Sequence, residues 1–205
     1  MDNTIITYIL VGITLVTSWQ AFNNPDMRFK MLFSPRDIRQ RGEYYRFISS
    51  GLIHADWFHL GFNMLALYSF GQVVEPRYGA LFGVWGKLLY LLLYFGAMIA
   101  GDIAAYFRHR QHAYFSLGAS GAVSGVVFAF ILFQPWAQLL VFFIPMPAIV
   151  AGLLYVGYSY YSATRGSIDG IAHDAHLLGG LFGFFFSIIL SPESLTSFIQ
   201  QLFGS

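Results

Sequence analysis

The chain has 205 residues, of which 57% are hydrophobic and only 10% are charged, and its mean hydropathy is +0.59. A soluble domain carries about 25% charged residues, so this composition predicts a protein whose main solvent is lipid. A net charge of +1 argues against nucleic acid as a partner, and the lack of cysteine excludes disulfides, thiolate nucleophiles and cysteine-ligated metal sites.

Apolar stretches predict six membrane-spanning helices, because a bilayer core about 30 Å thick requires about 20 apolar residues per helix. The candidates lie at 4–22, 57–74, 81–107, 119–133, 148–162 and 170–190. The first lacks a basic segment before it and a small-residue cleavage site after it, so we expect a retained helix rather than a signal peptide. We therefore predict an all-α membrane protein, a polytopic six-helix bundle in a single domain over 1–205, with a large first loop at 23–53 and a short amphipathic tail at 193–205.

The fourth predicted helix begins with small residues and two serines. Ser120 and Ser124 lie one turn apart on one face, and so do Gly121 and Gly125. Small residues four apart allow two helices in a membrane to approach closely. Taken alone, this segment is explained equally well by a packing seam and by a functional serine.

The sixth predicted helix carries His176, Gly179 and Gly183 on one stripe, a second close-approach seam. If the two seams pack together, His176 can meet Ser120, and an imidazole that reaches a serine hydroxyl is the minimum for nucleophilic catalysis. His176 alone is also compatible with a structural hydrogen bond between helices. Asp174 lies about 200° around the helix from His176, so we expect a dyad rather than a triad.

The second predicted helix supplies possible oxyanion donors. His59 and Asn63 are four residues apart and share one helix face. Such side chains, together with a backbone amide such as that of Ser120 at a helix N-terminus, can stabilise the oxyanion of acyl transfer. Considered alone, His59 and Asn63 are better explained by hydrogen bonds between neighbouring helices.

Taken together, these residues resemble the rhomboid proteases. The resemblance runs from about residue 45 to residue 183 and includes a GxSG motif, an AHxxGxxxG motif, an HxxxN motif with a preceding histidine, a Trp-Arg pair in the first loop and a Glu-x-Arg after the second helix. No single motif is specific, but all occur in order. They are matched here by Gly118, Ser120 and Gly121; Ala175, His176, Gly179 and Gly183; His59 and Asn63 with His54; Tyr45 and Arg46; and Glu75 and Arg77.

The resemblance implies an intramembrane serine endopeptidase that cleaves transmembrane segments of membrane-protein substrates. Ser120 would be the nucleophile and His176 the general base, while His59, Asn63 and the Ser120 amide would form the oxyanion hole. The other matched residues would have supporting roles. The chemistry requires no metal or cofactor, and the partners would be transmembrane substrates and the lipid bilayer, not nucleic acid. Residues 158–170 and the fifth helix would form the mobile side through which substrates arrive.

The chain departs from the family pattern at two positions. Tyr45 replaces the tryptophan of the Trp-Arg pair, which leaves a packing role intact. Ser124 occupies a position where many relatives carry a bulky residue, in some an aromatic ring that stacks on the catalytic histidine. Ser124 also belongs to a second x-x-Ser-Gly segment, but Ser120 is preferred because it begins the helix and because Gly118 completes the motif.

The bilayer adds two expectations. Polar residues lie toward one end of their helices and predict a water-filled cavity open on that side, lined by His54, His59, Ser116, Ser120 and His176. Basic residues in the first loop would place that loop in the cytoplasm by the positive-inside rule. The resemblance implies the opposite orientation for most bacterial members. We follow it and expect a multi-pass protein of the bacterial inner (cell) membrane with both termini cytoplasmic.

Two other functions compete with this interpretation. The six histidines fall into three pairs, which suggests the histidine boxes of membrane di-iron desaturases and hydroxylases, since imidazole suits iron. Those enzymes generally carry eight or more histidines, some of them adjacent, which this chain lacks. A non-catalytic channel or transporter is the other alternative, and its activity would survive Ser120→Ala.

Overall fold

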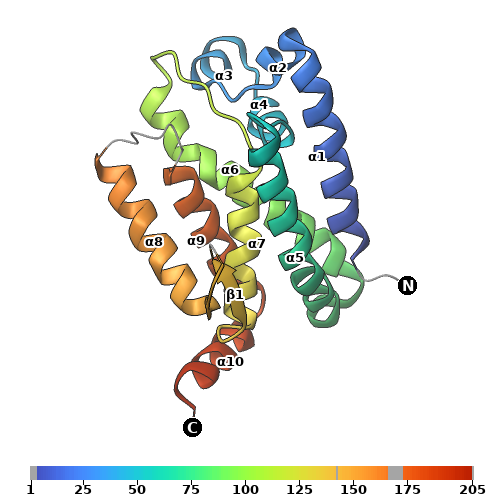
Figure 1. Ribbon diagram of the computed structural model, residues 1–205, viewed down its shortest axis with the longest axis vertical. Helices are drawn as coiled ribbons and strands as arrows, with labels where there is room; N and C mark the ends of the chain where they lie inside the picture. The colour runs from blue at the N-terminus through green and yellow to red at the C-terminus, as the bar shows by residue number, and fades with distance from the viewer. Residues whose placement is uncertain (1–3, 142, 166–172, 205) are drawn as a thin grey trace.

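The computed structural model describes residues 4–141, 143–165 and 173–204, which form a mostly helical protein (Figure 1). Short 3-10 helices are labelled η. In chain order the elements are α1 (Ile5–Asn23), α2 (Pro25–Met31), α3 (Pro35–Arg41), α4 (Arg46–Ser49), η1 (Ser50–Leu52), α5 (Trp57–Phe82), η2 (Gly83–Trp85), α6 (Gly86–His109), α7 (Ser120–Phe133), β1 (Gln138–Val141), β2 (Ile144–Pro147), α8 (Ala148–Arg165), α9 (His173–Leu190) and α10 (Pro192–Phe203).

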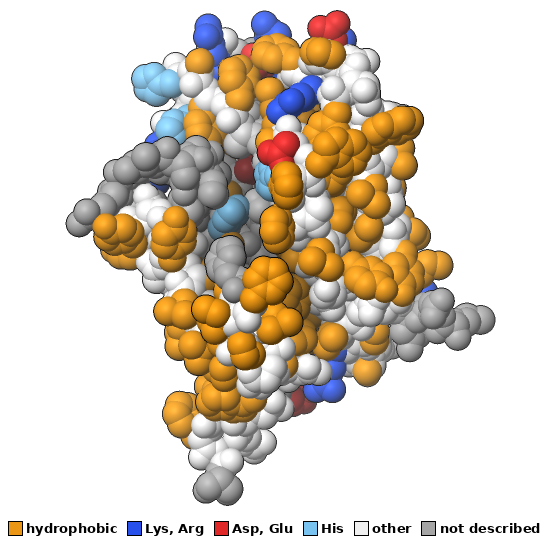
Figure 2. Space-filling model, in the orientation of Figure 1, with side chains coloured by type: hydrophobic (Ala, Val, Ile, Leu, Met, Phe, Trp, Pro, Cys, Tyr) orange, Lys and Arg blue, Asp and Glu red, His pale blue; other side chains and the backbone are white. Residues whose placement is uncertain are grey.

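Several of these helices are suited to a membrane. Among the described residues, α1 and the stretch Trp57–His109 are long and apolar enough to cross one, and Ala175–Leu190 with Pro192–Phe203, bent by 110°, would make a third candidate. The stretch Trp57–His109 contains α5 and α6, which pack against each other, and each is about 36 Å or longer at 1.5 Å per residue. Figure 2 shows hydrophobic side chains over the middle of one face and charged side chains concentrated toward the end that carries α2 and α3.

The large predicted loop at 23–53 is folded into short helices. Asn24 and Ser34 cap α2 and α3 by accepting hydrogen bonds from the backbone N–H groups of Met27 and Asp37. Pro25 and Pro35 follow these caps at the first helical position, where a proline costs no hydrogen bond. Figure 1 shows α2–α4 together at one end of the molecule, away from the start of α1 and from α10.

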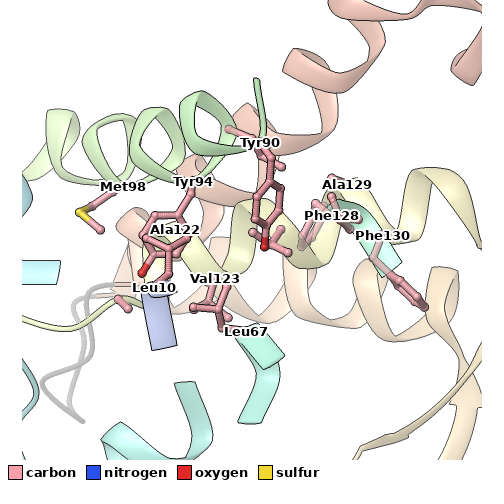
Figure 3. Close-up of a cluster of buried hydrophobic side chains, with 14 of the residues drawn as sticks. Leu10, Leu67, Tyr90, Tyr94, Met98, Ala122, Val123, Phe128, Ala129 and Phe130 are labelled. Carbon is pink, nitrogen blue, oxygen red and sulfur yellow. The ribbon is translucent and has the colours of Figure 1, made fainter. Parts of the chain in front are cut away.

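The core is built around α7, most of whose residues are buried. Helices α5, α6 and α9 pack against it. Figure 3 shows the interior, where side chains from α1, α5, α6 and α7 meet. The residues labelled there are Leu10, Leu67, Tyr90, Tyr94, Met98, Ala122, Val123, Phe128, Ala129 and Phe130.

Glycines allow α7 and α9 to touch backbone to backbone. A Cβ atom on Gly179 would collide with the carbonyl oxygen of Gly121 and lie 3.0 Å from its Cα, and a Cβ on Gly183 would lie 2.5 Å from the Cα of Gly125. The two glycine seams predicted from the sequence are therefore the surfaces at which these helices meet. Their close packing fixes the height of α9 relative to α7.

Two details differ from the sequence-based expectation. Helix α5 continues to Phe82 with Pro76 inside it, so Glu75 and Arg77 lie within this helix rather than after it. The segment before α8 is not a simple loop, because β1 and β2 form an antiparallel hairpin, so the description all-α is wrong in this detail. The hairpin satisfies backbone groups that a proline-rich connection would leave unpaired.

Candidate active site

Ser120 is the first residue of α7, so its amide is one of the N–H groups that begin the helix. The first backbone hydrogen bond of the helix runs from the Val123 N–H to the Ala119 carbonyl, at 2.9 Å. The amides before Val123 therefore precede the repeating hydrogen-bond pattern, and the helix dipole favours negative charge beside them. This position combines a hydroxyl group with N–H donors suited to an oxyanion.

The structure brings His176 to Ser120. The distance between His176 Nε2 and Ser120 Oγ is 2.6 Å, which is hydrogen-bonding distance. The two residues come from different helices, and His176 lies less than one turn before Gly179, which packs on Gly121. The glycine seam is therefore what places the imidazole beside the hydroxyl.

The turn before Ser120 is held from three directions. Ser116 and Phe33 exchange two backbone hydrogen bonds, of 3.0 and 3.3 Å. The Gly118 N–H donates to the Ser50 carbonyl at 2.9 Å, and the Ala119 N–H donates to His54 Nε2 at 3.2 Å. Three separate parts of the chain thus fix the backbone that presents the serine.

His54 is a fully buried member of this support. Its Nε2 accepts from the Ala119 N–H, so the ring proton lies on Nδ1, which is 3.0 Å from Ser18 Oγ. Ser18 in turn donates to the Leu52 carbonyl. Burial, helped by the nearby His59, lowers the pKa of His54 to about 3, so the ring is neutral at pH 7. Because His54 is 0% exposed, it does not line a water-filled cavity, contrary to the expectation from sequence.

His59 lies against Gly118. Asp56 caps α5 by accepting from the His59 N–H at 2.8 Å, which places the histidine in the first turn. A Cβ atom on Gly118 would lie 2.6 Å from His59 Cε1, and Gly118 has a φ of +118°, where glycine is favoured. Glycine therefore permits both the sharp turn before Ser120 and the approach of the His59 ring.

Asn63 is buried one turn further along α5. Its Nδ2 donates a hydrogen bond of 2.9 Å to the His59 carbonyl. An amide nitrogen carries two hydrogens, so one contact holds the side chain while a second hydrogen can serve another acceptor. The structure thus places His59 and Asn63 on successive turns of one helix face.

A small pocket adjoins the serine. Its volume is about 30 Å³, and its lining includes Asp102, Ser116, Gly118, Ser120 and Ala175. A polar site needs roughly 10–15 Å³ of this kind of volume to hold a water molecule. The pocket therefore has room for water directly beside the nucleophile candidate.

Comparison with known proteins decides the family. Residues 41–193 match the rhomboid domain. This chain belongs to the rhomboid family. It is 28% identical over 186 residues to RHOMBOID-like protein 12, mitochondrial, of Arabidopsis thaliana. The matched region covers 85% of this chain and 54% of that protein. It is 36% identical over 149 residues to Rhomboid protein 1, mitochondrial, of Saccharomyces cerevisiae, covering 68% of this chain and 41% of that protein.

A bacterial relative carries the name of an enzyme. Rhomboid protease GluP of Bacillus subtilis is 33% identical over 142 residues, covering 69% of this chain and 26% of that protein. The chain thus spans about half or less of the length of these three relatives. Membership of the family makes this chain a multi-pass helical membrane protein.

The remaining rhomboid motif residues lie away from Ser120. Arg46 is buried, forms an ion pair of 2.6 Å with Glu43, and donates to the carbonyl oxygens of Phe29 and Leu32. It therefore holds the folded first loop together. The adjacent Tyr45 donates to the Lys30 carbonyl at 3.1 Å.

Glu75 attaches α1 to α5. Its carboxyl group accepts hydrogen bonds from the backbone N–H groups of Ile6 and Thr7 and from Thr7 Oγ1, at 2.8–2.9 Å. It thus takes the place of a cap at the N-terminus of α1. Arg77 is exposed and lies over the ring of Phe133, 5.7 Å from its centroid.

Tyr155 lies beside His176 and is hydrogen-bonded to Ser124. The ring of Tyr155, from α8, lies nearly parallel to the imidazole, and its hydroxyl is 2.7 Å from Ser124 Oγ. Ser124 stands out in the sequence, whereas no sequence pattern predicted the contact of Tyr155 with His176. The signal in the sequence is the small residue at 124, which leaves space for a side chain from another helix.

Among the described side chains, the histidines of the di-iron alternative do not gather into one metal-binding group. His54 and His59 have ring centroids 5.0 Å apart, whereas His109 stacks on Tyr114 at 4.2 Å. Within the described ranges, no three His, Asp or Glu residues are placed to share a metal ion. The side chains of His173 and Asp174 lie outside the described residues, so the expected exclusion of Asp174 from the pair stays a prediction.

Proposed function

We propose that this rhomboid is an intramembrane serine endopeptidase that cleaves transmembrane segments of membrane proteins through a Ser120–His176 dyad. The observation that carries the proposal is the distance of 2.6 Å between Ser120 Oγ and His176 Nε2. A hydroxyl group becomes an effective nucleophile when an adjacent base accepts its proton.

The chemistry follows from the positions of the groups. His176 Nε2 takes the proton as Ser120 Oγ attacks the scissile carbonyl carbon, and the carbonyl oxygen becomes an oxyanion. The amide of Ser120 and the side chains of His59 and Asn63 would donate to that oxygen. His176 then returns the proton to the leaving amine. In deacylation, His176 takes a proton from a water molecule of the pocket beside Ser120 as the water oxygen attacks the acyl carbon. His176 then gives that proton to Ser120 Oγ as the ester bond breaks, which releases the acid product and restores the serine.

The proposed arrangement in the membrane has six spans, α1, α5, α6, α7, α8 and α9, in a single domain. The start of α1 and the end of α10 both lie away from the end of the molecule that carries α2–α4 (Figure 1). Chain ends on the same side support an even number of spans. We place the protein in a bacterial inner membrane with both termini cytoplasmic. Alkaline phosphatase fused after Gln111 is then active and fused after Gly79 is inactive. Activity after Gly79 contradicts this orientation.

The decisive experiment is cleavage of a reporter transmembrane substrate by the purified full chain in liposomes, with fluorophosphonate labelling as a second readout. Ser120→Ala and His176→Ala are expected to abolish cleavage while leaving the thermal unfolding transition in place. Ser124→Ala retains labelling and part of the activity. Cleavage that persists in Ser120→Ala contradicts the proposal. If cleavage is lost only in Ser124→Ala, the nucleophile is Ser124 instead.

A further inference from the structure

Tyr155 connects the proposed catalytic pair to a third helix. It reaches from α8 to His176 on α9, and the two rings have centroids 6.2 Å apart and planes 16° apart. Offset parallel rings at such a separation attract each other. The imidazole that contacts Ser120 through Nε2 is therefore also in contact with an aromatic ring that neither α7 nor α9 supplies.

Two contacts on α7 fix the position of the Tyr155 ring. Its hydroxyl lies 2.7 Å from Ser124 Oγ, and its ring lies 5.8 Å from that of Phe128, measured between centroids. Ser124 is buried and sits one turn after Ser120. Contacts to α7 at its hydroxyl and at its ring thus hold Tyr155 in the position in which it stacks on His176.

Helix α8 packs less extensively on the other helices than α9 does. Its buried residues Ala148, Gly152 and Ser159 are all small and share one stripe with Tyr155. The opposite side of α8 exposes large apolar side chains, and Figure 1 shows the helix at the outer edge of the bundle, beside α9. The exposed residues are Val150, Leu153, Leu154, Tyr158, Tyr160 and Tyr161. Displacement of α8 would withdraw the one large ring that this stripe places against His176.

We propose that Tyr155 is a positioning residue that holds the His176 imidazole in line with Ser120, so that the dyad is aligned only when α8 is seated against α7 and α9. This inference rests on the proposed protease function. Ser124 has a defined part in it, because its hydroxyl anchors the ring that orients the histidine.

The test measures kcat and KM for a reporter transmembrane substrate. Tyr155→Leu removes the ring and is expected to lower kcat by about tenfold or more with KM changed by less than about twofold, because a misoriented base weakens the transition state rather than substrate binding. Tyr155→Phe and Ser124→Ala each remove one end of the hydrogen bond and should each lower kcat by about threefold. Tyr160→Leu, on the exposed side of α8, is the matched control and should leave both constants unchanged.

The double variant Ser124→Ala/Tyr155→Phe separates positioning from general packing. If the two groups act through one hydrogen bond, the double variant loses no more kcat than either single variant. If the kcat losses of the two single variants multiply in the double variant, the proposal is overturned. It is also overturned if Tyr155→Leu has the wild-type kcat or changes only KM. If Tyr155→Leu does not fold, the double-variant comparison decides alone.

The wild type and Ser120→Ala are assayed in parallel to keep this inference apart from the protease proposal. Cleavage that disappears in Ser120→Ala supports the protease function whatever Tyr155 does. Cleavage that persists in Ser120→Ala removes both proposals, whereas a Ser120-dependent reaction with normal kcat in Tyr155→Leu removes only the role of Tyr155.

Discussion

The backbone N–H of Ala119 donates a hydrogen bond to Nε2 of the buried His54 ring, at 3.2 Å. The residue that follows Ala119 is Ser120, so this bond fixes the backbone immediately before the nucleophile candidate. Nε2 can accept only while it carries no proton. The shape of the turn is therefore coupled to the charge of a histidine that has no place in the proposed chemistry.

Stability should fall as the pH is lowered. The pKa of His54 is about 3 in the folded protein and about 6.5 in the unfolded chain, so below pH 6.5 the unfolded state binds the extra proton. The stabilisation is complete above pH 6.5 and is lost progressively toward pH 3, by about 2 kcal/mol at pH 5. Thermal unfolding at pH 7.5 and 5.0 measures it. His54→Gln keeps an acceptor but cannot titrate, so its Tm should change less between the two pH values; an equal change contradicts the assignment.

Gly118→Ala should impair both folding and activity. The new Cβ would lie 2.6 Å from His59 Cε1, at a backbone φ of +118°. Such a conformation costs a non-glycine residue about 1–3 kcal/mol, and the displaced His59 should lower kcat by about 100-fold. Tm and cleavage rate are the measurements. Gly61→Ala is the matched control, because a Cβ there meets nothing within 4 Å; a normal cleavage rate in Gly118→Ala would show that the turn tolerates a side chain.

Loss of the proposed oxyanion donors should act on kcat. Asn63→Ala and His59→Ala are each expected to lower kcat by about 100- to 1,000-fold with little change in KM, because these groups interact with charge that develops in the transition state. Steady-state kinetics on a reporter substrate provide the measurement. A raised KM with an unchanged kcat would instead assign the two side chains to substrate binding.

Glu75→Ala should destabilise the protein without altering the chemistry of the folded fraction. The substitution removes three hydrogen bonds and leaves the N–H groups of Ile6 and Thr7 without their acceptor. We expect a loss of about 3 kcal/mol or more, as for other buried hydrogen-bonded groups. Arg77→Ala is the control and should cost about 1 kcal/mol or less, since it removes one exposed cation–π contact. Equal melting temperatures for the two variants would contradict the role of Glu75.

Much of the site was accessible from sequence because its residues follow helical periodicity. The stripes Gly121–Gly125 and Gly179–Gly183 predict which helix faces meet, and the geometry that joins Ser120 and His176 follows from that contact. The pairing is a consequence of helix periodicity and small-residue packing, both of which are local properties of the chain.

The contacts that the sequence did not predict are long-range and follow no periodic pattern. Tyr155 meets Ser124 and His176 only because α8 packs at a particular height, which no periodic pattern specifies. The bridge between Phe33 and Ser116 depends on how the first loop folds back. Pro76 was expected beyond the end of a helix, yet α5 accommodates it, since tertiary packing can outweigh local propensity.

The shortness of α7 sets the depth at which hydrolysis would take place. The helix has 14 residues, which at 1.5 Å per residue is about 21 Å, against a hydrocarbon core of about 30 Å. Helix α7, from Ser120 to Phe133, is therefore shorter than that core, and the segments on either side of it must complete the proposed span. A thicker bilayer would bury Ser120 further from water, whereas a thinner one would bring it closer to the surface, so in the proposed enzyme lipid chain length would influence the rate of cleavage.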